Sequence, residues 1–464
     1  MKQLKNLLLT TDAYKASHFK QLPANSDGAR FYIAPRKPLT KTEKEFIVFG
    51  ISYFIETYLR KPITLEDITY ARKIYSKFNV LGKQYPFPYD GFLKIVNEYN
   101  GYLPINIYGV KEGEVKFKYN TPIAIIEVFD KDLVWLPGFI ETAFQRAVWY
   151  GSTVATNSRN VRKLLDLFYF DSVDPDNYWT LDSRLHDFGA RGVSSGESAA
   201  LGGLAHLINF NGTDTMEAVV LGIEMYNIEV QDLASSIPAA EHSTVTSWGP
   251  YQINERQALD NMIDKFTTKE DTLFAFVSDS YDYKKMVDQV WGDPEIIERI
   301  KETGKIPVVR PDSGDPVEMV LYALNSLEKT WGVITNKKGY RILDGIRIIQ
   351  GDGMDYKKIK ELYSAILNAG FSAENVAVGM GGGLLQKLDR DSMSWSMKMF
   401  QIRRDGIWIN VMKNPKTQES KKGWNPNDGV NIDDWVTYYN KTKNISNFPE
   451  ARLDFKEIRG RARI

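Results

Sequence analysis

The chain has 464 residues, of which 43% are hydrophobic and 25% charged, and its 59 Lys and Arg residues balance its 59 Asp and Glu residues. These values are typical of folded globular protein, and the zero net charge gives no general attraction toward nucleic acid or an anionic membrane. The absence of cysteine excludes disulfides, thiolate catalysis and cysteine-ligated zinc. The apolar runs are too short for a signal peptide or a membrane span, so we expect a soluble cytoplasmic protein.

The first third of the chain mixes helical and strand patterns. Residues 41–60 carry apolar side chains at helical spacing, which predicts an amphipathic helix. Residues 104–128 contain three short β-rich runs separated by Gly, Asn and Pro, which predicts a small antiparallel sheet. We therefore expect residues 1–178 to form a mixed α+β domain.

A second pattern follows, in which strands alternate with helices. Apolar runs that end in acids, Arg or Gly occur at 273–277, 306–309, 346–349 and 376–378, with helical patterns between them at 281–292, 316–331 and 355–369. Further strands can come from 182–188, 206–210 and 236–242. Apolar strands with intervening helices indicate a buried parallel sheet, and six or seven of them favour a barrel over an open sheet. The predicted fold class is α/β, with an irregular (β/α) barrel over residues 179–388.

The pattern of alternating strands and helices stops near residue 390. Residues 395–402 and 407–411 predict a hairpin that turns at Asp405–Gly406, and residues 413–424 predict a polar loop. We expect residues 389–464 to pack back on the N-terminal domain.

Three acids end three successive predicted strands: Asp279, Asp312 and Asp352. Acids that converge on one barrel mouth can bind Mg²⁺, directly or through water, or accept hydrogen bonds from sugar hydroxyls. Asp is also a good helix cap, and for any single position capping is an equal alternative. For three equivalent positions we favour a binding role.

A glycine run, Gly381-Gly382-Gly383, opens a predicted helix and can offer backbone N–H groups to a phosphate, although such a run is often only a tight turn. Arg390, Ser396 and Lys398 follow closely enough in sequence to complete that pocket.

Other side chains in the barrel segment can carry chemistry. His242 follows a predicted strand in a stretch of small residues, beside Glu241, and can act as an acid, a base or a phosphoryl acceptor. Phe188 can stack a flat heterocycle, and Arg191 can hold phosphate oxygens. Taken alone, however, this segment is better explained by a core Phe and a surface Arg pair.

Taken together, these segments resemble the nicotinamide phosphoribosyltransferases, of the nicotinate phosphoribosyltransferase-like (type II phosphoribosyltransferase) family. The matching motifs run in order through nearly the whole chain: TDAYK at 11–15, HDFGARGVSS at 186–195, NFNGTDT at 209–215, IPAAEHST at 237–244, VSDSYD at 277–282, VRPDSG at 309–314, IQGDG at 349–353 and GGGLLQKL at 381–388.

The resemblance implies transfer of phosphoribosyl from phosphoribosyl pyrophosphate (PRPP) to nicotinamide, with Mg²⁺, in a homodimer with shared active sites. It also implies that ATP phosphorylates the residue corresponding to His242, with Asp279 in the environment of the histidine and of the metal. Other roles follow by matching position. For the base, the resemblance implies that Phe188 and the partner's Tyr14 sandwich the pyridine ring, and that Asp214 and Arg310 orient the carboxamide. For PRPP, it implies ribose contacts from Asp312, Gly351 and Asp352, a 5′-phosphate pocket of Gly381, Gly382, Arg390, Ser396 and Lys398, and a pyrophosphate site in which Arg191, Arg36 and Lys15 join His242.

Asp214 decides the expected substrate, because a carboxylate there accepts a hydrogen bond from a carboxamide and repels the carboxylate of nicotinate. Two alternatives remain: a nicotinate phosphoribosyltransferase, and a non-catalytic binding or signalling protein on the same scaffold.

Overall fold

The structure is a computed structural model that describes residues 6–268, 273–413, 423–430, 435–440 and 454–463. The described chain divides into two compact units, each taken by itself below. Unit 1 comprises residues 1–156, 224–227 and 388–464, and unit 2 comprises residues 157–223 and 228–387. The first boundary between the two units, after residue 156, lies inside a long helix, α4 (Leu136–Ser172), rather than after residue 178. The division at residues 178 and 388 into three segments stays a prediction.

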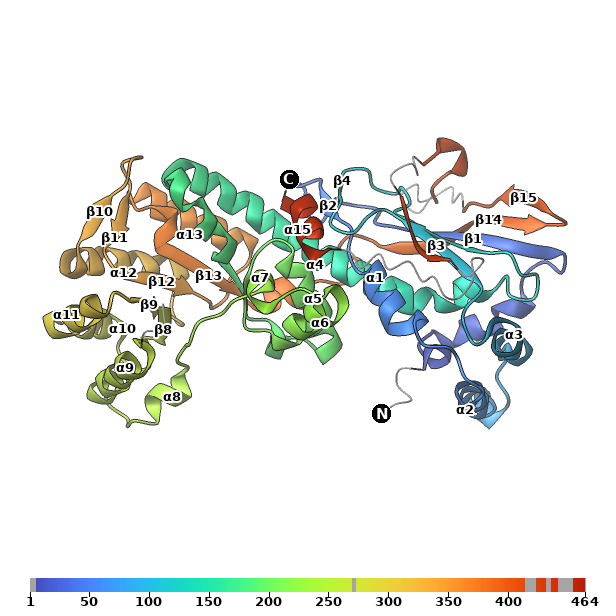
Figure 1. Ribbon diagram of the computed structural model, residues 1–464, viewed down its shortest axis with the longest axis horizontal. Helices are drawn as coiled ribbons and strands as arrows, with labels where there is room; N and C mark the ends of the chain where they lie inside the picture. The colour runs from blue at the N-terminus through green and yellow to red at the C-terminus, as the bar shows by residue number, and fades with distance from the viewer. Residues whose placement is uncertain (1–5, 269–272, 414–422, 431–434, 441–453, 464) are drawn as a thin grey trace. The chain divides into compact units, whose positions relative to one another are not determined.

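Unit 1 is built on an antiparallel six-stranded sheet with the strand order β15-β14-β1-β5-β3-β16 (Figure 1). Strands from the C-terminal tail flank the three N-terminal strands on both sides, because β14 pairs with β1 and β16 pairs with β3. The predicted α+β domain formed by the N-terminal third and the C-terminal tail is therefore confirmed. Its strands are β1 (Ser26–Ala34), β3 (Ile105–Gly109), β5 (Ala124–Val128), β14 (Ser396–Arg404), β15 (Ile407–Asn410) and β16 (Val436–Asn440), with a separate pair, β2 (Phe46–Ile47) and β4 (Val115–Lys116).

The hairpin predicted after residue 390 is present, and Asp405 and Gly406 turn between β14 and β15, both with positive φ. The helix predicted over residues 41–60 is wrong in its first half. There Phe46 and Ile47 lie buried in strand β2. Gly50, with φ at +102°, separates this extended segment from the helix that begins at Ile51. The helices of unit 1 are α1 (Ile51–Phe54), which continues as a π-helical turn to Leu59, α2 (Leu65–Tyr75), α3 (Tyr89–Tyr99), the first part of α4, and α15 (Phe455–Arg463).

Unit 2 contains a curled parallel sheet with the order β7-β6-β13-β12-β9-β8. The four strands predicted with flanking helices are confirmed, because short apolar runs between Gly and acid residues extend readily and bury both faces. The strands are β6 (Leu185–Asp187), β7 (Gly212–Thr213), β8 (Leu273–Val277), β9 (Ile306–Arg310), β12 (Arg347–Gln350) and β13 (Val376–Met380); β10 (Val333–Thr335) and β11 (Arg341–Leu343) form a separate hairpin.

Residues 235–240 join the two edges of this sheet. The backbone of Ser235 bonds to β7 and its neighbour Asn211, and the backbone of Pro238 and Ala240 bonds to Ala275 of β8. The expected irregular barrel is thus confirmed, with this segment in place of a full strand at 236–242. The strand expected at 206–210 is wrong, because residues up to Leu207 continue a small-residue helix that is buried.

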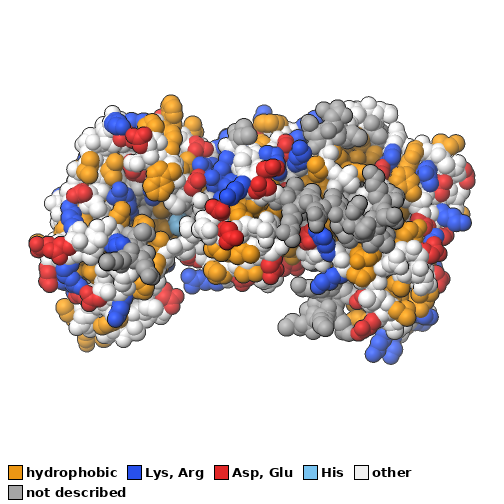
Figure 2. All heavy atoms as spheres, viewed as in Figure 1, with side chains coloured by type: hydrophobic (Ala, Val, Ile, Leu, Met, Phe, Trp, Pro, Cys, Tyr) orange, Lys and Arg blue, Asp and Glu red, His pale blue; other side chains and the backbone are white. Residues whose placement is uncertain are grey.

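The helices of unit 2 lie around the curled sheet, and α8 stands apart from those that lie along it (Figure 1). They are the second part of α4, α5 (Gly196–Leu207), α6 (Met216–Tyr226), α7 (Val230–Leu233), α8 (His242–Thr246), α9 (Gln252–Phe266), α10 (Tyr283–Lys285), α11 (Pro294–Thr303), α12 (Pro316–Trp331), α13 (Tyr356–Asn368) and α14 (Gly382–Leu385). In the space-filling view, acidic and basic side chains are mixed over the visible face of each unit, as expected from zero net charge (Figure 2). None of the helices in the described residues has the length and apolarity to cross a bilayer.

Glu112 is a fully buried acid that ties three parts of unit 1 together. Its Oε1 accepts the N–H groups of Gly50 and Ser52 at 2.8 and 3.0 Å, and its Oε2 accepts the Tyr226 hydroxyl at 3.0 Å. Its backbone carbonyl accepts a bond from Arg461 Nε at 3.0 Å. Burial raises the pKa of Glu112 above its ordinary value of 4.5.

We predict that Glu112→Gln changes how thermal stability depends on pH. Because the pKa of Glu112 is higher in the folded than in the unfolded protein, this group stabilises the fold fully below the unfolded pKa of about 4.5. That contribution to the free energy of unfolding is lost as the pH rises through the folded-state pKa. The amide keeps the three bonds, with the Tyr226 hydroxyl now accepting, and it does not titrate. The melting temperature of the variant should therefore increase relative to that of the wild type as the pH rises from 4 to 8. Parallel melting curves at every pH would contradict this account.

Candidate active site

Three strands of the barrel are each followed by two acids three residues apart. The second acid of each pair caps the next helix by accepting backbone N–H bonds in its first turn: Asp282 for α10, Asp315 for α12 and Asp355 for α13. Capping by the first acids was the alternative explanation for Asp279, Asp312 and Asp352. Because the second acids take that role, the first acids are available at the barrel mouth.

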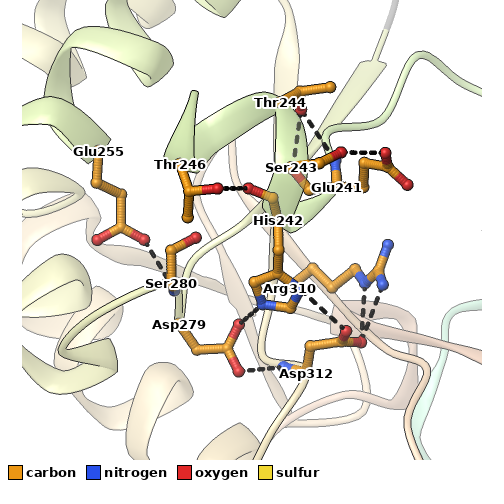
Figure 3. Close-up of polar contacts among 10 residues, drawn as sticks. All are labelled: Glu241, His242, Ser243, Thr244, Thr246, Glu255, Asp279, Ser280, Arg310 and Asp312. Carbon is orange, nitrogen blue, oxygen red and sulfur yellow. Dashed lines mark hydrogen bonds and ion pairs between the residues drawn. The ribbon is translucent and has the colours of Figure 1, made fainter. Parts of the chain in front are cut away.

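Two of the first acids surround the His242 ring (Figure 3). The Asp279 carboxylate lies 2.9 Å from His242 Nε2, and its other oxygen accepts the Asp312 backbone N–H at 3.2 Å. Asp312 Oδ2 lies 3.8 Å from His242 Nδ1, while Arg310 donates to Asp312 Oδ1 from Nε and Nη2 at 3.1 and 3.0 Å. The structure therefore brings together four of the predicted site residues.

This arrangement fixes the chemistry available to His242. The Asp279 side chain is 4% exposed and the His242 side chain 46% exposed, so the ring is held from the protein side and open on the other. A carboxylate at Nε2 favours the tautomer with the proton on Nε2, which leaves the Nδ1 lone pair for an electrophile. Glu241, its neighbour in sequence, instead caps α8 and accepts the Ser243 hydroxyl.

Glu255 is a buried acid behind this cluster that the sequence reasoning missed. Its Oε1 accepts the Ser280 backbone N–H at 3.2 Å, next to Asp279 (Figure 3). Its Oε2 accepts the side-chain amide of Gln252 at 2.5 Å. Burial raises its pKa to about 7. The available signal was an acid on the apolar stripe of α9, in helical register with Ala258 and Leu259.

The Phe188 ring lies on the sheet at the barrel mouth. A Cβ at Gly379 would come within 2.0 Å of this ring and one at Gly351 within 3.0 Å, so glycine at both positions leaves room for it. The ring packs on a core cluster that includes Ala275 and Ile349. The exposed Asp214 follows β7, and its carboxylate accepts the Ser236 hydroxyl.

The loops after β6 and β13 also meet at the mouth. A Cβ at Gly192, beside the exposed Arg191, would lie 3.7 Å from the backbone nitrogen of Gly382. Gly381 and Gly382 begin α14, which is only four residues long. Asp352 is exposed in the turn after β12.

The remaining predicted residues lie in unit 1. Tyr14 is 56% exposed, whereas Lys15 is buried and forms an ion pair with Glu141 at 2.7 Å. Arg390 is exposed and pairs with its neighbour Asp391. Because they belong to the other unit, the structure does not join these residues to the barrel residues; the same holds for Arg36, Ser396 and Lys398.

Arg36, Ser396 and Lys398 lie near one another, where β1 and β14 pair. Burial lowers the pKa of Lys398, and the positive charges of Arg36 and Lys413 lower it further. The Ser396 hydroxyl is buried and has no hydrogen-bond partner among the described residues. Cations that repel one another beside an unsatisfied hydroxyl form a site that an anion would stabilise.

The described residues do not form a complete metal site by themselves. Nowhere in the described ranges do three His, Asp or Glu side chains gather closely enough to hold one. Mg²⁺ is often bound by one or two carboxylates together with substrate phosphates and water. Asp279 and Asp312 fit that limited role.

Comparison with known proteins identifies the family. Residues 183–445, more than half of the chain, match the model of the nicotinate phosphoribosyltransferase (NAPRTase) family, and residues 6–107 match the nicotinamide phosphoribosyltransferase N-terminal domain. The chain is 42% identical to the nicotinamide phosphoribosyltransferase of Xanthomonas campestris pv. campestris over 91% of this chain and 86% of that protein. It is 28% identical to the enzyme of the same name from Mycoplasma genitalium, over 90% of this chain and 94% of that one.

A solved structure shows the same fold. Human nicotinic acid phosphoribosyltransferase superposes with a TM-score of 0.54 at 16% identity, covering 84% of this chain and 74% of that one. The family match, the relative at 42% identity and the shared fold agree with one another. The chain belongs to the nicotinate phosphoribosyltransferase family, and it is similar along most of its length to the family's nicotinamide phosphoribosyltransferases.

Proposed function

We propose that this cytoplasmic enzyme transfers the phosphoribosyl group from PRPP to nicotinamide, giving nicotinamide mononucleotide and pyrophosphate in NAD salvage. The structural observation that carries the proposal is the junction of β6 and β7. There the Asp214 backbone N–H donates to the Asp187 carbonyl at 3.0 Å, so the ring of Phe188 and the carboxylate of Asp214 belong to adjoining loops. A flat ring beside a hydrogen-bond acceptor suits an aromatic carboxamide.

The chemistry requires positioning more than acid–base catalysis. The pyridine nitrogen carries no proton, so its attack on the anomeric carbon needs no general base. That carbon passes through an oxocarbenium-like transition state while pyrophosphate departs as a polyanion. Phe188 would stack the ring, Asp214 and Arg310 would orient the carboxamide, and the turn at Gly351 and Asp352 would contact the ribose together with Asp312.

Two anion sites complete the proposal. Gly381, Gly382 and the unit 1 residues Arg390, Ser396 and Lys398 would hold the 5′-phosphate. Arg191 would hold pyrophosphate with His242, Arg36 and Lys15, and Tyr14 would cover the nicotinamide ring. We assign Tyr14, Arg36 and Lys15 to the partner subunit of a homodimer. Mg²⁺, held by Asp279 and Asp312 through water, would neutralise charge on the leaving pyrophosphate.

We further propose that His242 couples the reaction to ATP. Its Nδ1 would attack the γ-phosphorus, so an N–P bond forms as the P–O bond to ADP breaks. Asp279 at Nε2 would stabilise the imidazolium character of the product. The exposed face of the ring leaves room for that phosphate.

Asp214 should set the choice between nicotinamide and nicotinate. Two carboxylates about 4 Å apart at an effective dielectric of about 20 repel by roughly 4 kcal/mol, which corresponds to about a thousandfold discrimination. We expect Asp214→Asn to raise the kcat/KM ratio of nicotinate to nicotinamide by about a hundredfold or more. Pyrophosphate release with each base, PRPP and Mg²⁺ measures this.

Glu217→Gln is the matched control for this charge change, because Glu217 is an exposed acid in the first turn of α6, three residues from Asp214. Its selectivity should equal that of the wild type. Faster turnover of nicotinate than of nicotinamide by the wild-type enzyme would show that the substrate assignment is wrong and favour the nicotinate alternative. No turnover of either base would favour a binding protein.

His242→Ala should separate coupled from uncoupled catalysis. The variant should lose acid-labile phosphate incorporation from γ-labelled ATP and lose the stimulation of turnover by ATP, because no other imidazole replaces His242. Asp279→Asn should reduce the same two readouts by about tenfold or more, since an amide favours a different ring orientation. Ser247→Ala, on the exposed end of the same short helix, is the control. Full ATP stimulation in His242→Ala would exclude the coupling role.

A further inference from the structure

We propose that Asp187 is a positioning residue of the base pocket, which holds the loop of Phe188 and Arg191 in a fixed relation to the loop of Asp214. The identity of the ligand rests on the proposed function, but the tie between the loops does not. Asp187 lies between His186 and Phe188 in the HDFGARGVSS motif, and none of the expected contacts to substrate involves it.

The contacts of Asp187 reach both loops. Its side chain has no exposed surface, and its Oδ1 accepts the Gly189 backbone N–H at 2.7 Å. Its Oδ2 accepts the Thr213 hydroxyl at 3.5 Å, and its carbonyl accepts the Asp214 N–H at 3.0 Å. Asp187 therefore binds Gly189, which directly follows Phe188, and also binds both Thr213 and Asp214.

The space around this carboxylate is made by glycines. A Cβ at Gly189 would come within 3.0 Å of Oδ1, and a Cβ at Gly203 of α5 would come within 3.0 Å of Oδ2. The same Cβ atoms would also meet Leu385 at 2.6 Å and Ala218 at 2.6 Å. The acid thus fills a cavity that fits its two oxygens closely, so its rotamer is fixed by packing as well as by hydrogen bonds.

The charge of Asp187 is not neutralised by a neighbour. Asp187 makes no ion pair in the described part of the chain, and burial raises its pKa to about 6. The titratable group that acts on it is Asp214, which raises its pKa further, while the hydrogen bonds from Gly189 and Thr213 lower it. In its ionised form the group has oxygens that only accept, which fixes the Gly189 and Thr213 donors in one direction.

The main consequence concerns nicotinamide. If Asp187 is truncated, the Phe188 loop and the Asp214 loop lose their shared anchor, and the two contacts to the base no longer keep one geometry. PRPP should be affected less, because Arg191 is its one proposed contact in these two loops and the proposed contacts to the 5′-phosphate lie in other segments. A positioning role therefore predicts a larger loss of affinity for the base than for PRPP.

The experiment compares Asp187→Ala with Asp187→Asn. Asn keeps the shape, because its Oδ1 can accept from Gly189 and its amide can donate to Thr213 Oγ1. We expect the KM for nicotinamide to rise about tenfold or more in Asp187→Ala and to stay within about threefold of the wild type in Asp187→Asn. The KM for PRPP should rise by a smaller factor in Asp187→Ala, because only Arg191 contacts PRPP from this loop, and should change little in Asp187→Asn. Thr213→Val, which removes the weaker tie, should give a smaller rise and guards against misfolding of the Ala variant.

Glu112→Ala is the matched control, because it truncates another fully buried acid that accepts backbone N–H groups, in unit 1. It should lower the melting temperature without a selective change in the KM for nicotinamide. An unchanged nicotinamide KM in Asp187→Ala, or an equal rise in both KM values, would overturn the proposal.

Hydrogen–deuterium exchange separates this inference from the proposed function. The amide of Gly189 should exchange faster in Asp187→Ala than in Asp187→Asn or the wild type, whatever base the enzyme uses. If the wild type does not turn over nicotinamide, the proposed function fails and the exchange result still decides whether the tie exists. Equal exchange of the Gly189 amide in all three proteins would show that there is no tie.

Discussion

The Asp279 carboxylate organises the barrel mouth, because each of its oxygens binds a group from a different loop. One oxygen orients the His242 ring at the start of α8, and the other fixes the Asp312 backbone after β9. Arg310 then holds the Asp312 side chain. These contacts are possible only because parallel strands place the ends of β8 and β9 at the same edge, with residues 235–240 bringing His242 to it.

Two acids, three residues apart, follow each of the strands β8, β9 and β12. This pairing explains how the barrel keeps carboxylates for ligands and still caps the N-termini of its helices. A helix start needs a side-chain acceptor, and the acid that caps a helix has its oxygens turned toward the backbone. Asp282, Asp315 and Asp355 provide those acceptors. The chain thus meets a folding requirement and a chemical requirement with separate residues at each strand end.

The sequence predicted what depends on local pattern and missed what depends on packing. Helix α12 and strand β8 were placed at their observed bounds, because apolar periodicity and terminal acids specify them locally. The strand expected at 206–210 is absent because the run of Gly and Ala before it packs a buried helix that continues to Leu207. The clustering of His242, Asp279 and Asp312 was predicted from their positions at strand ends. Glu255 and Asp187 instead accept backbone N–H groups, and their partners depend on the tertiary fold, although the apolar stripe of α9 did mark Glu255 as buried.

Buried acids at three places in this chain share one physical logic. Glu112, Glu255 and Asp187 each accept a backbone N–H where the chain changes direction, at Gly50, Ser280 and Gly189. Burial without a cation raises each pKa, which is a cost in stability as the pH rises. A hydroxyl or an amide would avoid that cost but carries donors that can turn toward other partners. In its ionised form an acid only accepts, so it holds a loop in a single arrangement. This suits the loops of Asp279 and Phe188, which Glu255 and Asp187 hold.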